Sequence, residues 1–217
     1  MISRYLKTAG LVIPALACYG VSLLPLILVW PHLDTRPLIG AMAVWSILAV
    51  ISLPFVLRLI IRKVWFFRGR GEPVSLNLLV SMLVGINELD CPVIARKKRN
   101  KIIFSWRSSE PAWCERMALE GRRKTYELRL RFDSDTRTVT MIDRVRRLDL
   151  DLCPVKVRTG LLSFPRLYCR ISTGLHKGLE SFKNRPPEEF RFQPRELKES
   201  VFNTIVANGW NVRFDLF

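Results

Sequence analysis

The sequence predicts a membrane α-helical hairpin followed by an α+β cytoplasmic domain, an antiparallel β-barrel or sandwich with a C-terminal helix and strand. Three observations carry this prediction. Two apolar runs without charge lie near the start of the 217-residue chain, segments of alternating polarity begin near residue 101, and 35 Lys and Arg outnumber 19 Asp and Glu for a formal net charge of +16. We therefore expect a transmembrane hairpin over 1–61, a basic juxtamembrane connector over 62–100 and a β-rich domain over 101–217.

The two apolar runs, 9–30 and 37–57, contain no charged side chain. A helix of about 20 apolar residues crosses a hydrocarbon core about 30 Å thick, so each run is long enough to span a membrane. The short turn PHLDTR between them makes the second helix return antiparallel to the first. Trp45 lies well inside the second run, where we expect its indole to pack against the first helix.

Basic residues set the expected direction of the hairpin. They lie before the first helix and after the second, whereas Arg36 in the turn is offset by Asp34. The positive-inside bias therefore predicts a multi-pass protein of the cell inner membrane with both termini in the cytoplasm. Where the chain leaves the second helix, the side chains expected at the membrane interface are Arg58, Arg62, Lys63, Trp65, Phe66, Phe67, Arg68 and Arg70.

The start of the chain also partly resembles a lipoprotein signal, with Cys18 as the lipid acceptor. Polar chain would follow a cleaved signal, but here uncharged residues continue directly after Cys18. An uncleaved hairpin is therefore the prediction, and lipidation at Cys18 is the alternative.

Residues 74–86 are apolar but too short to span a membrane. We expect them to form the first buried element of the domain; an interfacial segment and a contact with a partner are the alternatives. A β-hairpin is expected over 125–143, because Tyr126 and Leu128 alternate with Glu127 and Arg129 before the turn sequence DSDTR.

Further short segments of alternating polarity predict additional strands with one wet face each. These lie at 101–107, 147–152, 155–158, 166–172 and 189–193, with a long loop over 174–189. Pro194 in a first helical turn and Gly209 just past the last turn bracket a helix near the end of the chain. The last residues, 211–217, alternate again and predict a strand whose apolar side chains enter the core.

The motifs of known catalytic sites are missing from the sequence. It contains no nucleophile elbow, zinc-protease helix, phosphate-binding loop or dinucleotide fingerprint. The five cysteines form no C-x-x-C pair and only two histidines are present, so we expect reduced thiols and no metal site. We accordingly predict that the protein is not an enzyme and has no cofactor.

The excess of positive charge points instead to an anionic partner; the alternative is that it serves only membrane orientation and solubility. Basic residues surround the predicted hairpin at 125–143, where they could hold nucleic acid or a nucleotide through phosphate groups; a solvated sheet face partly neutralised by Asp and Glu is the alternative. The candidate anion-binding residues are Arg122, Arg123, Lys124, Arg129, Arg131, Arg144, Arg146 and Arg147. The run RKKRN at 96–100 is a denser cluster, suited to acidic lipid or nucleic acid.

This arrangement of a charge-free helix pair and a basic, β-rich domain resembles the two-transmembrane effectors of bacterial anti-phage systems, both retron-associated and cyclic-oligonucleotide-associated. The resemblance is one of architecture. It implies a toxin of antiviral defense: a nucleic-acid, nucleotide or ribonucleoprotein trigger is sensed on the cytoplasmic side, and the hairpins form a homo-oligomer that impairs the membrane.

Small residues at Gly10, Gly20, Gly40 and Ala41 would allow the close helix contacts that such an oligomer in the lipid bilayer needs. The alternative is a non-toxic, hairpin-anchored binding or accessory subunit of a membrane complex.

Overall fold

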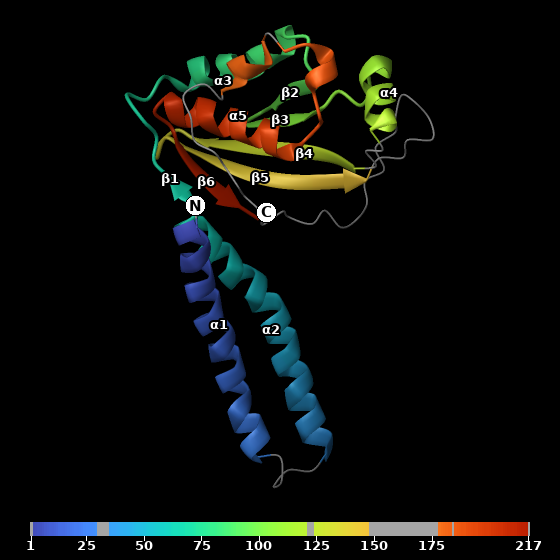
Figure 1. Cartoon of the computed structure of the whole chain (residues 1–217). Coiled ribbons are helices and arrows are strands. Elements are labelled where there is room, and N and C mark those ends of the chain that lie inside the picture. Colours follow the sequence, from blue (N-terminus) through green and yellow to red (C-terminus); the bar gives the residue numbers. More distant parts are fainter. Residues whose placement is uncertain (1, 30–34, 121–123, 148–177, 184, 217) are drawn as a thin grey trace. The chain divides into compact units, whose positions relative to one another are not determined.

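The computed structural model describes residues 2–29, 35–120, 124–147, 178–183 and 185–216. The chain divides into two compact units, Met1–Trp65 and Phe66–Phe217 (Figure 1). The first unit is helical, and the second holds the β-strands.

The first unit is a pair of antiparallel helices, α1 over Ile2–Val29 and α2 over Thr35–Val64. Both are long and apolar enough to cross a membrane by length and composition. They extend beyond the predicted spans of 9–30 and 37–57, because the charged residues that flank the apolar runs remain helical. Most of their large apolar side chains are exposed, an area of apolar surface that is unfavourable in water.

Polar groups along the two helices hydrogen-bond to one another. The Tyr19 hydroxyl lies 2.7 Å from the Ser52 hydroxyl, and the Trp45 indole donates to the Ser22 hydroxyl at 3.0 Å. The prediction that Trp45 packs against the first helix is thereby confirmed. These bonds satisfy groups that would be costly to leave unpaired in an apolar solvent.

The second unit is built on a six-stranded sheet in the order β1–β6–β5–β4–β3–β2. The strands are β1 (Phe66–Phe67), β2 (Val93–Lys98), β3 (Lys101–Trp106), β4 (Lys124–Asp133), β5 (Thr138–Arg147) and β6 (Asn211–Asp215). All neighbours are antiparallel except β5 and β6, which run parallel.

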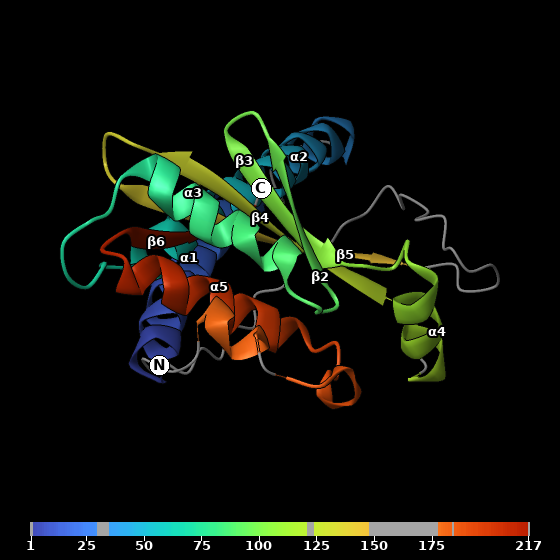
Figure 2. The ribbon, with the colours of Figure 1, turned by 90° about the horizontal axis from the view of Figure 1, so that it is seen from above.

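The sheet is open and mixed, so the predicted antiparallel barrel or sandwich is wrong. The edge strands β1 and β2 do not pair with each other, which a barrel would require. Helices take the place of the second layer of a sandwich: α3 and α5 both cover the same face of the sheet (Figures 1 and 2). The parallel β6 follows from α5, because a strand that returns beside β5 through a helix crossing the sheet arrives parallel to it.

The helices of this unit are α3 (Leu76–Val84), α4 (Pro111–Leu119) and α5 (Pro194–Ala207), with 3₁₀ turns at η2 (Gly85–Glu88), η3 (Leu179–Phe182) and η4 (Pro187–Glu189). The expectation of a buried apolar element at 74–86 is confirmed, since Leu79, Leu83 and Ile86 are buried. The predicted C-terminal helix and strand are confirmed as α5 and β6.

The β-hairpin expected over 125–143 is confirmed as β4 and β5, and the strand expected at 101–107 as β3. The strand expected at 189–193 is wrong, because this segment is a 3₁₀ turn followed by irregular chain. Its alternation has another cause: the rings of Phe190 and Phe192 are both buried and both meet Trp113 edge to face. The strands expected between 148 and 172 lie outside the described residues.

Two further differences concern the start of the domain and its cysteines. The second unit begins at Phe66 rather than at 101, since the expected connector contributes β1, α3 and β2 to it.

Cys114 is disulfide-bonded and is therefore not the reduced thiol that the sequence suggested, whereas Cys18 and Cys91 are free. The partner of Cys114 lies outside the described residues.

Candidate anion-binding site on the sheet

The two faces of the sheet differ in chemistry. Strand pairing places Phe104, Leu128 and Asp143 in one cross-strand row and Leu130, Met141 and Phe214 in the next. All six are buried beneath the helices. The residues between them along each strand point to the opposite face, because side chains alternate along a strand. That opposite face carries Arg96, Lys98, Lys101, Arg129, Arg131, Arg144 and Arg213.

Three of the predicted candidates lie on this outer face, and two of them flank one carboxylate. Glu127 lies directly opposite Arg144 in the pairing of β4 with β5, and the Arg129 guanidinium lies 3.2 Å from the Glu127 carboxylate. Arg131 is exposed further along β4. The charge around Arg129 and Arg144 is therefore partly neutralised by Glu127, as the alternative of a solvated, mixed face anticipated.

Three more of the predicted candidates lie where the β4–β5 hairpin opens, at the end away from its turn. Lys124 begins β4, and Arg146 and Arg147 end β5, but their side chains lie outside the described residues. Arg122 and Arg123 lie outside them altogether.

A second cluster carries charge that has no counterion in the described structure. It is formed by Arg96, Lys97, Lys98, Arg99 and Lys101 on β2, β3 and the turn between them, and we call it the basic tip. All five side chains are exposed. Within the described part of the chain, none of the five has a side-chain hydrogen bond or ion pair. The charge run at 96–100 is visible in the sequence, but the sequence does not show that these side chains lack a counterion among the residues that the structure describes.

Like charges face one another across the strands at this end of the sheet. Lys98 is opposite Lys101, and Lys101 is opposite Arg131 on the next strand. Directly opposed like charges destabilise a strand pair, by an amount similar to the roughly 0.2–1 kcal/mol that opposite charges contribute. An anion bound over this row would remove that repulsion.

The turn of the basic tip has a fixed and slightly strained geometry. Arg99 has a φ of 51°, in the left-handed region where glycine or asparagine is usual. The Asn100 side chain donates a hydrogen bond to the Phe132 carbonyl at 3.1 Å, which ties the turn to the end of β4. The backbone therefore presents the basic side chains from a held position.

The β4–β5 turn lies at the same end of the sheet, and its acidic group is already engaged. The Asp133 carboxylate accepts hydrogen bonds from the Thr136 hydroxyl at 2.7 Å and from the Asp135 amide at 3.2 Å. The bond from the Thr136 hydroxyl is the largest cause that lowers the pKa of Asp133 below its ordinary value. This carboxylate shapes its own turn rather than neutralising the basic tip.

The residues expected at the membrane interface separate into two groups. Arg58, Arg62 and Lys63 lie near the end of α2, where positive charge is favoured by the helix dipole. Trp65 follows them and is buried in the first unit, with its indole donating to the Thr8 hydroxyl at 3.1 Å and its ring edge to face with Tyr5.

The remaining members belong to the second unit. Phe66 and Phe67 form β1, and the Phe67 ring packs against Phe202 and Phe214 at centroid distances of 4.9 and 5.5 Å. This ring contributes to the core of the domain, unlike the interfacial position expected for it. Arg68 and Arg70 are exposed. Only one residue separates the end of α2 at Val64 from the start of β1 at Phe66.

The segment after β1 is bonded to the turn between α5 and β6. The Arg70 amide donates to the Val206 carbonyl at 2.7 Å, and the Trp210 indole donates to the Val74 carbonyl at 2.8 Å. Gly69 and Gly209 lie so close that a Cβ on Gly69 would stand 2.3 Å from the Gly209 backbone. Residues 66–74 are therefore a fixed part of the domain.

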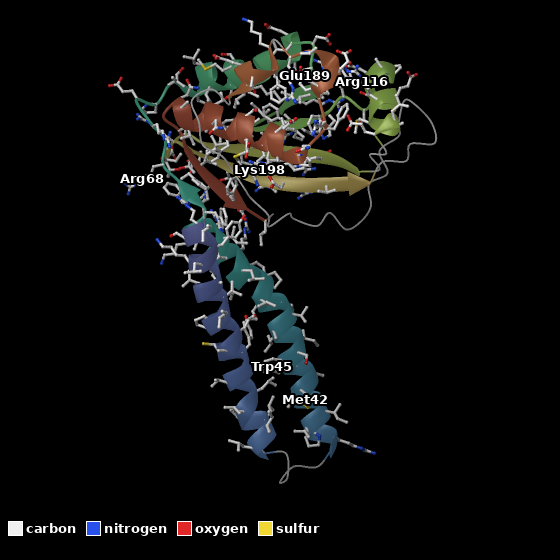
Figure 3. All side chains as sticks on the ribbon, viewed as in Figure 1. Met42, Trp45, Arg68, Arg116, Glu189 and Lys198 are labelled. Carbon is white, nitrogen blue, oxygen red and sulfur yellow. The ribbon has the colours of Figure 1, made fainter. Side chains whose placement is uncertain are left out.

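A second polar cluster lies on the helix-covered face, where solvent does not reach. Lys198 of α5 forms an ion pair with Asp143, whose carboxylate also accepts a hydrogen bond from the Tyr126 hydroxyl at 3.0 Å. All three residues are buried. Their role is structural, because all three side chains are removed from solvent; Figure 3 labels Lys198 on α5. Within the described residues, no group of three or more His, Cys, Asp or Glu side chains could hold a metal ion.

Comparison with known proteins adds no relative: no family model, curated protein or solved structure matches the chain.

Proposed function

We propose that the protein is a membrane-anchored effector of an anti-phage abortive-infection system. Its domain senses a trigger in the cytoplasm, and its hairpins assemble in the inner membrane and impair membrane integrity. One observation carries the proposal: a helix pair with long charge-free runs and exposed apolar side chains is joined in one chain to a domain whose exposed basic tip has no counterion among the described residues. The first part suits a bilayer, and the second suits an anionic trigger.

Three glycines on the hairpin support the assembly step of the proposal. Gly10, Gly20 and Gly40 have no atom within 4 Å of the position where a Cβ would stand, so these glycines do not serve the contact between α1 and α2. Small residues open to the outside let helices of other copies approach closely. Two helices cannot enclose a pore, and a homo-oligomer is therefore part of the proposal.

The test is inducible expression in a bacterial host, followed with a dye that reports membrane potential. Wild type is expected to depolarise the membrane and arrest growth, and a variant lacking residues 2–29 is expected to do neither. The double variant Gly20→Leu, Gly40→Leu should abolish depolarisation while leaving membrane insertion intact. Val44→Leu with Val50→Leu is the matched control, because both positions are exposed on α2 and already bulky. Normal potential at matched wild-type expression would overturn the proposal.

The second candidate is a non-toxic, hairpin-anchored binding or accessory subunit. It is favoured by Leu78 and Met82, which lie one turn apart on α3 with exposed fractions of 46% and 41%. An exposed apolar pair of this kind suits contact with another protein. Normal growth and potential, together with co-purification of a membrane complex that Leu78→Ser and Met82→Ser disrupt, would favour this candidate.

A further inference from the structure

We infer that the basic tip binds double-stranded nucleic acid through its phosphate groups, without reading base sequence. The inference deepens the proposed function, since it rests on that function and names the chemical class of the anionic trigger. It is tested by binding of the purified chain, so that its failure and the failure of the effector proposal can be told apart.

The cations of the tip stand at spacings that match a polyanion rather than one small ion. Lys98 and Lys101 of the tip are cross-strand neighbours, and Arg131 continues their row on the adjacent β4. With strands about 4.8 Å apart, this row spans roughly 10 Å, and Arg96 adds a second row about 7 Å further along β2. Several lysine and arginine side chains over this area can contact successive phosphates of a duplex, which carries one charge per ~1.7 Å of its axis.

The tip is positively charged on both faces of its two strands. Arg96 and Lys98 lie on the outer face, whereas Lys97 is paired with Ile102 and lies on the opposite face, where it is also exposed. Arg99 occupies the turn between the strands. β3 also pairs with β4 here, so the tip is a corner of the sheet, and both faces of this corner carry exposed cations. The two strands of a duplex offer phosphates that both faces can contact. A bilayer surface would contact one side only, and this favours a duplex over lipid headgroups.

The composition of the tip favours a duplex over the alternatives as well. Residues 96–101 are only arginine, lysine and asparagine. Proteins that hold single strands stack unpaired bases on aromatic rings, and segments that insert into bilayers carry large apolar side chains. A surface made of arginine and lysine can contact phosphates. Such contacts position a protein on nucleic acid without specifying sequence.

The strained turn is consistent with a binding role for Arg99. A left-handed backbone conformation is energetically unfavourable for residues other than glycine and asparagine. Strain of this kind concentrates at functional positions. Arg99 has this conformation in the turn between β2 and β3, beside the exposed Lys98 and Lys101.

The experiment measures binding of the detergent-purified full chain to a labelled duplex of about 20 base pairs by fluorescence anisotropy, at several salt concentrations. The tip variant is Lys97→Gln, Lys98→Gln, Arg99→Asn, in which asparagine suits the left-handed turn. We expect it to bind at least about tenfold more weakly than wild type. The slope of log K against log salt should become shallower by about 0.9 for each phosphate that the variant no longer neutralises.

The matched control is Arg68→Gln, Arg70→Gln, Lys183→Gln, which removes the same charge from three exposed residues outside the tip. It should retain nearly full affinity and salt dependence. Equal losses in the tip and control variants would overturn the inference, because they would reflect net charge alone. So would undetectable binding of the wild-type chain to the duplex, or tighter binding to a single strand of equal length or to vesicles containing phosphatidylglycerol.

The two proposals separate cleanly. Binding that depends on the tip, in a chain that leaves membrane potential unchanged, would support the inference and refute the effector function. Depolarisation by a chain that does not bind the duplex would do the reverse.

Discussion

Lys198 on α5 and Asp143 on β5 form an ion pair inside the second unit, and the Lys198 ammonium also lies 4.3 Å from the centre of the Phe214 ring. The pair joins the covering helix to the middle of the sheet. It is largely removed from water, with side-chain exposures of 9% and 7%. A buried pair of this kind is a weak source of stability as a whole, but losing one member leaves the other charge unpaired.

Lys198→Met should therefore destabilise the domain by about 3–5 kcal/mol, measured from chemical unfolding of the full chain in detergent. The double variant Lys198→Met, Asp143→Asn should recover most of this loss, because the asparagine carbonyl can still accept the Tyr126 hydrogen bond. A single-variant loss below about 1 kcal/mol would contradict the assignment of a buried ion pair.

Deleting residues 212–217 should destabilise the domain strongly. The deletion removes most of β6, which lies between β1 and β5 and buries Val212 and Phe214. Loss of the melting transition followed by circular dichroism is the expected result. An unchanged transition would refute the placement of β6 inside the sheet.

Gly209→Ala should be more damaging than Gly71→Ala. Both glycines have positive φ, 76° and 78°, so both substitutions strain the backbone. Only at Gly209 would the new Cβ clash, at 2.5 Å from the Pro73 backbone, whereas nothing lies within 4 Å at Gly71. We expect a loss of about 1–2 kcal/mol at Gly71 and clearly more at Gly209. Equal losses in the two variants would argue against the close contact between these segments.

Arg99→Asn should raise stability by up to about 1 kcal/mol, since asparagine tolerates the left-handed conformation better than arginine. The same substitution should weaken binding of the duplex. A variant that is more stable and binds less well is the signature of a residue selected for binding. Reduced stability would instead indicate that the Arg99 side chain supports the fold.

Cys91 should resist modification in the folded protein. Its side chain is fully buried, and burial is the largest cause that raises the pKa of its thiol above the ordinary 9.0. The pKa of this thiol is therefore higher in the folded chain than in the unfolded chain. As the pH rises above about 9, the unfolded chain ionises Cys91 first, so the free energy of unfolding decreases. Labelling with a water-soluble disulfide reagent at about pH 8, where the thiol is the dominant form, should require denaturant. Rapid labelling of the native chain would contradict this environment.

Local sequence patterns were enough to predict the elements whose periodicity is strong. The charge-free runs predicted α1 and α2, and the alternation around Leu128 predicted β4. Pro194 and Gly209 predicted the two ends of α5. These features depend on neighbours a few residues away.

The arrangement of the sheet could not be predicted in this way. β1 consists only of Phe66 and Phe67, too short to show any period, and its pairing with β6 joins residues far apart in the sequence. The alternation of Phe190 and Phe192 suggested a strand, although these rings pack beside Trp113 in irregular chain. The surroundings of the basic residues were equally hidden. Strand register places Glu127 beside Arg129 and Arg144, whereas the tip has no counterion within the described ranges.

The single residue between α2 and β1 leaves no room for a flexible linker. Two Cα atoms on either side of one residue are at most about 7 Å apart, so the chain passes from the last turn of α2 into β1 almost directly.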